Sequence, residues 1–223
     1  MKPRLMISTL CLASIAIAGC ASNVTQPQDY SGFLSDYSQL KEAQSPSGVE
    51  VMRWVDPTLD VSRYHAVYVE PTQFYPKPQA TAKIPQSTLN GINTYYNQAL
   101  KRELVKSLPL ANAPGPGVIV VRAAITAVSS KTEALKPYEY VPVALVLAAV
   151  STGTGIRDQE TTLGTEAQFL DGANGKVLAQ VVRKGTGKPL ANDAQVMQAD
   201  DVKSVIDGWA ADLHQSYVKL RRL

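Results

Sequence analysis

The chain has 223 residues, of which 45% are hydrophobic, a share that is ordinary for a globular protein and allows a proper core. It carries 22 lysines and arginines against 19 aspartates and glutamates, which gives a formal net charge of +3. This slight excess forms no basic stripe of the kind that nucleic-acid-binding domains carry, so we expect no nucleic-acid partner.

The first 19 residues have the three parts of a secretory signal peptide. A basic head ends at Arg4, an apolar run covers residues 5–18, and small residues precede Cys20. The run is short for a membrane span, which needs about 20 apolar residues. Residues 17–20, Ile-Ala-Gly-Cys, resemble the lipobox of bacterial lipoproteins.

The lipobox resemblance implies a lipid anchor at Cys20. Its thiol would carry a diacylglyceryl group, the chain would be cut before it, and the new amine would be acylated. In such lipoproteins an Asp after the cysteine favours retention in the inner membrane. Ala21 follows here, which indicates the outer membrane. Residues 20–29 would be the lipidated tether, and residues 30–223 a single domain facing the periplasm.

Maturation changes the charge and the thiols of the chain. The 22 basic side chains become 20 when Lys2 and Arg4 leave, against an unchanged 19 acidic ones. Cys11 leaves with the signal, and Cys20 would be a thioether. We therefore expect no disulfide, no cysteine-based metal site and no cysteine nucleophile.

Residues 30–44 hold the first periodic pattern after the tether. Phe33, Tyr37 and Leu40 recur at i, i+4 and i+7, the spacing of one helix face, and predict a short helix.

The same stretch begins a resemblance to a known family. The pattern is Phe-Leu-x-Asp-Tyr-Ser-x-Leu over residues 33–40, then Trp54 with Pro57, then Tyr64 ahead of an apolar strand. It resembles an uncharacterised family of Gram-negative outer-membrane lipoproteins, described as a domain of unknown function. The likeness covers most of the mature chain and implies an architecture and an envelope location, but no activity.

Strands and a helix are predicted in the middle of the chain. Residues 64–70 alternate and predict a strand, and the proline-rich residues 71–85 predict a loop. Ser87 can cap a helix that extends to about Leu108. Its apolar stripe consists of Leu89, Ile92, Tyr96, Leu100 and Leu104. Residues 118–129 predict a strand, with Ile119, Val121, Ala123, Ile125 and Ala127 on one face.

The last third predicts a hairpin and a helix. Residues 163–184 alternate on both sides of a turn at 171–175. A helix begins near Asp200, and its apolar stripe consists of Val202, Ile206, Trp209, Leu213 and Leu220. Trp209 lies in the middle of this stripe, so we expect it to anchor the helix in the core. The whole order predicts a two-layer α/β (α+β) domain, a small and mostly antiparallel sheet with helices 87–108 and 200–221 on one face.

Catalytic and metal-binding residues are scarce. Catalytic triads need a histidine beside a nucleophile, whereas His65 opens a predicted strand and His214 borders the apolar stripe of the last helix. One acidic cluster is interpreted as the start and solvated face of the last helix: Asp200, Asp201, Asp207 and Asp212. The glycine-rich residues 153–156 and 185–189 depart from phosphate-binding motifs and predict turns. We therefore expect no catalysis, no cofactor and no metal.

Residues 141–150, Val-Pro-Val-Ala-Leu-Val-Leu-Ala-Ala-Val, are apolar but too few to span a bilayer as a helix. They fit a buried helix, or an exposed element that touches the membrane or a partner. We interpret the protein as a lipid-anchored, non-catalytic protein-binding or assembly module with a partner protein in the envelope. The alternative is a small-molecule or lipid-binding lipoprotein with a pocket near residues 141–156.

The lipid anchor is directly testable. Cys20→Ser should leave an unacylated precursor and remove any processed protein from the membrane fraction, because the thiol is the acceptor of the diacylglyceryl group. Fractionation and intact mass spectrometry measure this. An unmodified N-terminus directly after Gly19 in the wild-type protein would contradict the prediction.

Overall fold

The computed structural model describes residues 24–132 and 159–222. Its sheet is built from strands β1 (Lys41–Gln44), β2 (Glu50–Val55), β3 (Ala66–Val69), β4 (Gln73–Phe74), β5 (Val118–Thr132), β6 (Gln159–Asp171) and β7 (Val177–Thr186). The helices are α1 (Gln86–Leu104) and α2 (Lys203–Leu220), with short 3-10 turns η1 (Pro27–Asp29), η2 (Val61–Arg63) and η3 (Ala199–Val202).

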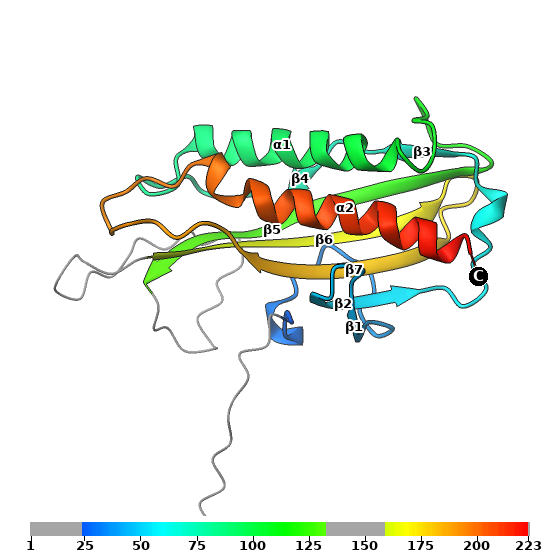
Figure 1. Ribbon diagram of the computed structural model, residues 1–223, viewed down its shortest axis with the longest axis horizontal. Coiled ribbons are helices and arrows are strands. Elements are labelled where there is room, and N and C mark those ends of the chain that lie inside the picture. The colour runs from blue at the N-terminus through cyan, green and yellow to red at the C-terminus, as the bar shows by residue number, and fades with distance from the viewer. Residues whose placement is uncertain (1–23, 133–158, 223) are drawn as a thin grey trace, which may run out of the picture.

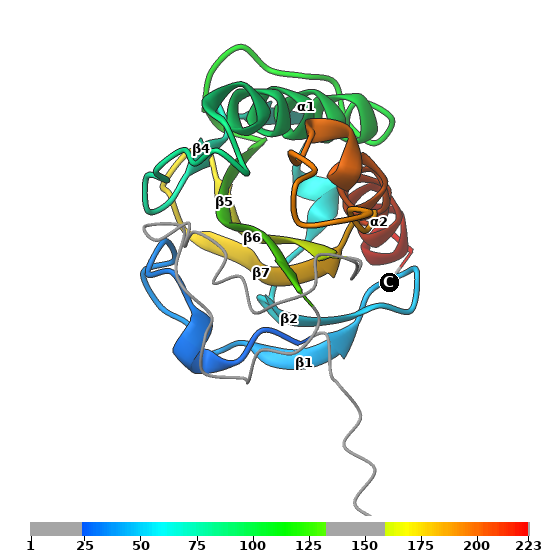
Figure 2. The same cartoon turned by 90° about the vertical axis from the view of Figure 1, so that its left-hand side faces the viewer.

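The seven strands form one sheet in the order β1-β2-β7-β6-β5-β3, with β4 also paired to β5. Neighbours from β1 to β5 are antiparallel, while β3 and β4 are parallel to β5. Both helices lie on one face of the sheet (Figure 1), which curves beneath them (Figure 2). The predicted two-layer α+β architecture is confirmed, including the hairpin, which is β6 and β7.

The helices bury the stripes that the sequence predicted. All five stripe residues of α1 are buried, and Trp209 of α2 is 6% exposed, which confirms it as part of the core. The predicted cap was wrong, because α1 begins at Gln86 after Pro85, and no side chain caps it. The helix also ends at Leu104 instead of Leu108. Within the described residues, neither helix combines the length and apolarity that a membrane crossing requires.

Strand β5 departs from the predicted alternation at a β-bulge. Its register against β6 shifts between Ile125 and Ala127, so one extra residue enters the strand there. The bulge exchanges the two faces, and Val128 joins the core while Ala127 is only half-buried. The prediction that Ala127 shares a face with Ile125 was therefore wrong.

The helix predicted over residues 30–44 does not form. Its last residues are strand β1, and residues 31–40 form turns held by side chains. The Tyr37 hydroxyl accepts hydrogen bonds from the backbone N–H groups of Gly32 and Leu34. The Asp36 carboxylate accepts a hydrogen bond from the backbone N–H of Ser38. These local bonds replace the helical ones.

The segment of residues 24–40, called here the N-terminal segment, covers the sheet face opposite the helices. Glu166 of β6 is 1% exposed and accepts hydrogen bonds from the Tyr37 hydroxyl at 2.6 Å and the Ser31 N–H at 2.8 Å. Leu34 packs with Val182 of β7 in a small apolar cluster beside this bond. Val24 is buried, and η1 forms, within the range expected to be tether.

The opposite face carries a buried ion pair that sequence reasoning placed wrongly. Asp212 was predicted on the solvated face of the last helix, but it is 1% exposed. Its carboxylate accepts a hydrogen bond from Arg183 Nη1 of β7 at 2.9 Å. It accepts two more from the backbone N–H and the hydroxyl of Ser47, at 2.9 and 3.0 Å. One carboxylate therefore joins α2, β7 and the turn between β1 and β2.

Removing this carboxylate should destabilise the domain strongly. Asp212→Ala leaves the Arg183 charge buried without a partner, which costs about 3–5 kcal/mol of unfolding free energy. Urea unfolding followed by circular dichroism measures the loss. Asp207→Ala is the matched control on the same helix, because Asp207 meets Arg102 at the surface and its side chain is 45% exposed. It should cost less than about 1 kcal/mol. Equal losses in the two variants would contradict the burial argument.

The Tyr37 contact predicts an alkaline decline of stability. Burial, followed by the hydrogen bond to Glu166, raises the pKa of Tyr37 to about 12 from an ordinary value of 10.0. The protonated Tyr37 hydroxyl contributes its full share of the folding free energy below pH 10. This share is lost as the pH rises toward 12, because Tyr37 releases its hydroxyl proton at a lower pH in the unfolded chain than in the folded one. Tyr37→Phe should therefore lose less stability than wild type over this interval in urea unfolding. Tyr75→Phe, which keeps the bond to Glu166, should retain the wild-type slope.

Candidate functional site

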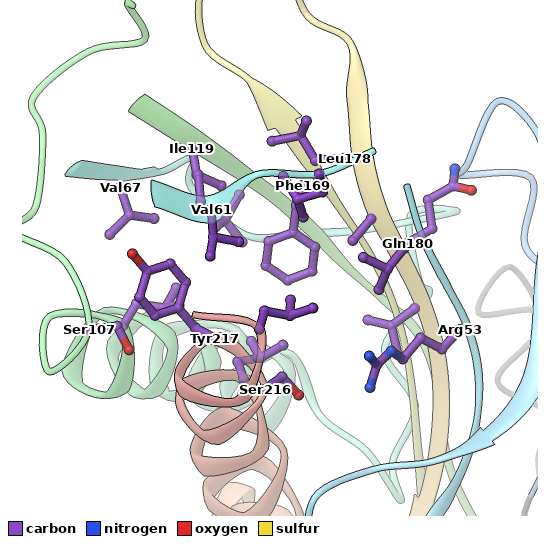
Figure 3. A pocket seen from close by; sticks show the side chains of 18 of the residues that line it. Arg53, Val61, Val67, Ser107, Ile119, Phe169, Leu178, Gln180, Ser216 and Tyr217 are labelled. Carbon is purple, nitrogen blue, oxygen red and sulfur yellow. The ribbon is translucent and has the colours of Figure 1, made fainter. Parts of the chain in front are cut away.

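An open pocket of about 100 Å³ lies between the helices and the sheet, at the end where both helices finish. Its floor comes from β5, β6 and β7, its roof from α2, and its sides from β2, η2 and the turn after α1 (Figure 3). The apolar lining residues are Trp54, Val55, Leu59, Val61, Val67, Leu104, Leu108, Ile119, Val121, Phe169, Leu178, Ala179, Val181, Leu213, Tyr217 and Leu220.

The pocket forms because the helix layer is incomplete over one end of the sheet. Helix α1 ends at Leu104, so only α2 covers this end of the strands. The last stripe positions of α2, Leu213 and Leu220, are therefore half-buried beside the cavity instead of closed into the core. On the floor, the small Ala179 is paired with Phe169 and leaves space above it. The same stripe that docks α2 thus ends as one wall of the cavity.

Polar groups lie along the rim of the pocket. Ser107 follows α1, and its hydroxyl lies 2.7 Å from His214 Nδ1. Ser216 lies on the α2 wall, while the Gln180 amide points away from the cavity (Figure 3). A nucleophilic serine needs a histidine that a third group orients. No carboxylate bonded to His214 is found in the described part of the chain, so the geometry supports a structural contact between Ser107 and His214.

Arg53 is a charged lining residue with no recorded partner among the described residues. Its register opposite Val181 places it on the helix-facing side of β2, where it is half-buried. The structure records no ion pair of its guanidinium and no hydrogen bond that the guanidinium donates to a described residue. Arg183 lies in the same pocket wall, but Asp212 pairs with it. The wall therefore holds two guanidinium groups and one carboxylate.

The histidines and acidic residues singled out in the sequence do not converge. His65 is exposed before β3, whereas His214 lies on α2 and contacts Ser107. Asp200 pairs with Lys203, and Asp201 accepts the Gln198 N–H at the start of η3, as a helix start predicts. In the described ranges, no three histidine, cysteine or acidic side chains gather closely enough to hold a metal ion.

The following sequence predictions concern residues outside the described ranges: the signal peptide of residues 1–19, the lipidation of Cys20, the apolar residues 141–150, the pocket near 141–156 and the turn at residues 153–156. Residues 185–189 are described, and the turn predicted there was wrong: Gly185 and Thr186 are the last residues of β7, and the chain then continues beside β6, with the Gly187 N–H donating to the Thr161 carbonyl and Leu190 bridging to Gln159. The observed pocket was not predicted, because its walls come from segments far apart in sequence.

Comparison with known proteins supports an envelope lipoprotein. The family described as "Protein of unknown function (DUF3313)" matches residues 29–213. The uncharacterized lipoprotein YdcL of Escherichia coli K12 is 41% identical over 206 residues, which is 92% of each chain. The similarity to a lipoprotein over nearly the whole length indicates a membrane lipid anchor.

Two solved structures match the chain at low similarity. The PelC dodecamer from Paraburkholderia phytofirmans is 14% identical with a TM-score of 0.38, over 74% of this chain and 96% of that one. Protein XCC0632 from Xanthomonas campestris is 10% identical with a TM-score of 0.41, over 75% and 91% of the two chains.

Proposed function

The chain belongs to the family of unknown function DUF3313, and we propose that it is a lipid-anchored binding protein whose ligand enters the pocket beneath α2. The anchor is the acylated Cys20, and the domain faces the periplasm from the outer membrane. The lipobox residues and Ala21 support this location, and the lipoprotein relative supports an anchor. The proposed role includes no catalysis.

The single observation that carries the proposal is the apolar pocket. Its lining side chains come from every element around it, and several of them, such as Leu213 and Tyr217, remain half-buried. An apolar cavity of about 150 Å³ in another protein accommodates benzene. A pocket of about 100 Å³ therefore suits the end of an alkyl chain or a small ring.

The pocket makes the small-molecule role better supported than the protein-binding role that the sequence favoured. Large exposed apolar side chains in the described residues lie singly on connections between elements: Val49, Tyr75, Val105, Leu110 and Val196. The edge strand β1 presents Lys41 and Glu42 to solvent, and charges of this kind discourage strand addition. A concave apolar site with a few polar groups is the usual form of a ligand pocket.

Filling the pocket mouth should abolish binding of an apolar probe. Ser216→Trp places an indole at the mouth, so the fluorescence increase of N-phenyl-1-naphthylamine should be lost. Ser204→Trp is the matched control, because Ser204 is exposed on the same helix and does not line the pocket. It should bind the probe like wild type. Thermal unfolding of both variants verifies folding. No probe binding to wild type, or unchanged binding to a folded Ser216→Trp, would overturn the proposed function.

A further inference from the structure

The charge of the pocket wall restricts the chemistry of its ligand. Two guanidinium groups, Arg53 and Arg183, lie in the lining, and Asp212 neutralises only Arg183. The two are close enough to interact: burial is the main cause that lowers the pKa of Arg183, and the charge of Arg53 adds to it. Among the residues that the structure describes, one positive charge at the site therefore has no counter-charge.

The position of this charge is specific. Arg53 extends from the β2 side of the pocket toward the α2 wall that carries Ser216, while apolar side chains fill the interior (Figure 3). A half-buried cation without an acceptor has lost part of its water, so an anion that reaches it gains a charge-assisted hydrogen bond. An apolar interior with a single cation at its rim is complementary to an amphiphile with an anionic head.

Resting on the proposed function, we propose that the ligand is a fatty acid, with its alkyl end in the pocket and its carboxylate on Arg53. A carboxylate carries one negative charge, which matches the one uncompensated guanidinium. It also accepts two parallel N–H bonds from an arginine. The Ser216 hydroxyl, on the opposite side of the mouth, is available as a further donor.

Competition against N-phenyl-1-naphthylamine tests the inference with decanoate and its neutral counterpart, decanol. Wild type should bind decanoate about 10 to 100 times more tightly than decanol, the range expected of hydrogen bonds to charged groups. This comparison needs no variant. Equal affinities, or tighter binding of decyl phosphate than of decanoate, would overturn the assignment of a carboxylate ligand.

Arg53→Gln removes the charge and should make decanoate bind as weakly as decanol, with binding of the neutral probe unchanged. Arg63→Gln is the matched control, because Arg63 is exposed on η2 beside the pocket but does not line it. It should keep the preference for decanoate. Unchanged decanoate binding by a folded Arg53→Gln would refute the role of Arg53. The probe still binds in that outcome, so failure of this inference is distinct from failure of the pocket.

Discussion

The buried ion pair between Arg183 and Asp212 is the contact on which the rest of the domain depends. It joins α2 to β7 and, through Ser47, to the turn between β1 and β2. Such a pair adds little net stability, because desolvation of both charges opposes their attraction. A shifted helix, however, would leave two charges buried apart. We interpret the pair as the contact that selects one position of α2 over the sheet.

The position of α2 in turn defines the pocket. Ser216 and Tyr217 follow Asp212 by about one helical turn, so the ion pair sets how far they stand above the strands. Arg183 belongs to the pocket wall itself, and Arg53 lies on the neighbouring strand. Residues of the structural ion pair and residues of the proposed binding site are thus adjacent. The carboxylate that compensates one arginine for the fold leaves the other available for a ligand.

Sequence periodicity predicted the elements that have one apolar and one polar face. It missed an element in which both faces are apolar. Helix α1 and the hairpin of β6 and β7 show clear periods, and both were found. Strand β2 was missed, because Val51 on one face and Trp54 on the other both pack in apolar clusters, which removes the alternation. Asp212 looked solvated because its partner Arg183 is 29 residues away. The pocket left no recognisable pattern in the sequence either. Arg53 meets the other pocket residues only when β2 pairs with β7 in the folded sheet.

The start of the N-terminal segment limits the distance between the proposed lipid anchor and the domain that holds the proposed pocket. Val24 is buried on the domain, and Glu166 binds the segment further along, so the chain is already packed against the domain at residue 24. With Cys20 acylated, only residues 21–23 would separate the lipid from Val24, a reach of at most about 14 Å. A pocket for fatty acids would then remain within about one domain diameter of the bilayer surface. An anchor this short suits a protein that exchanges an amphiphile with its own membrane better than one that carries it across the periplasm.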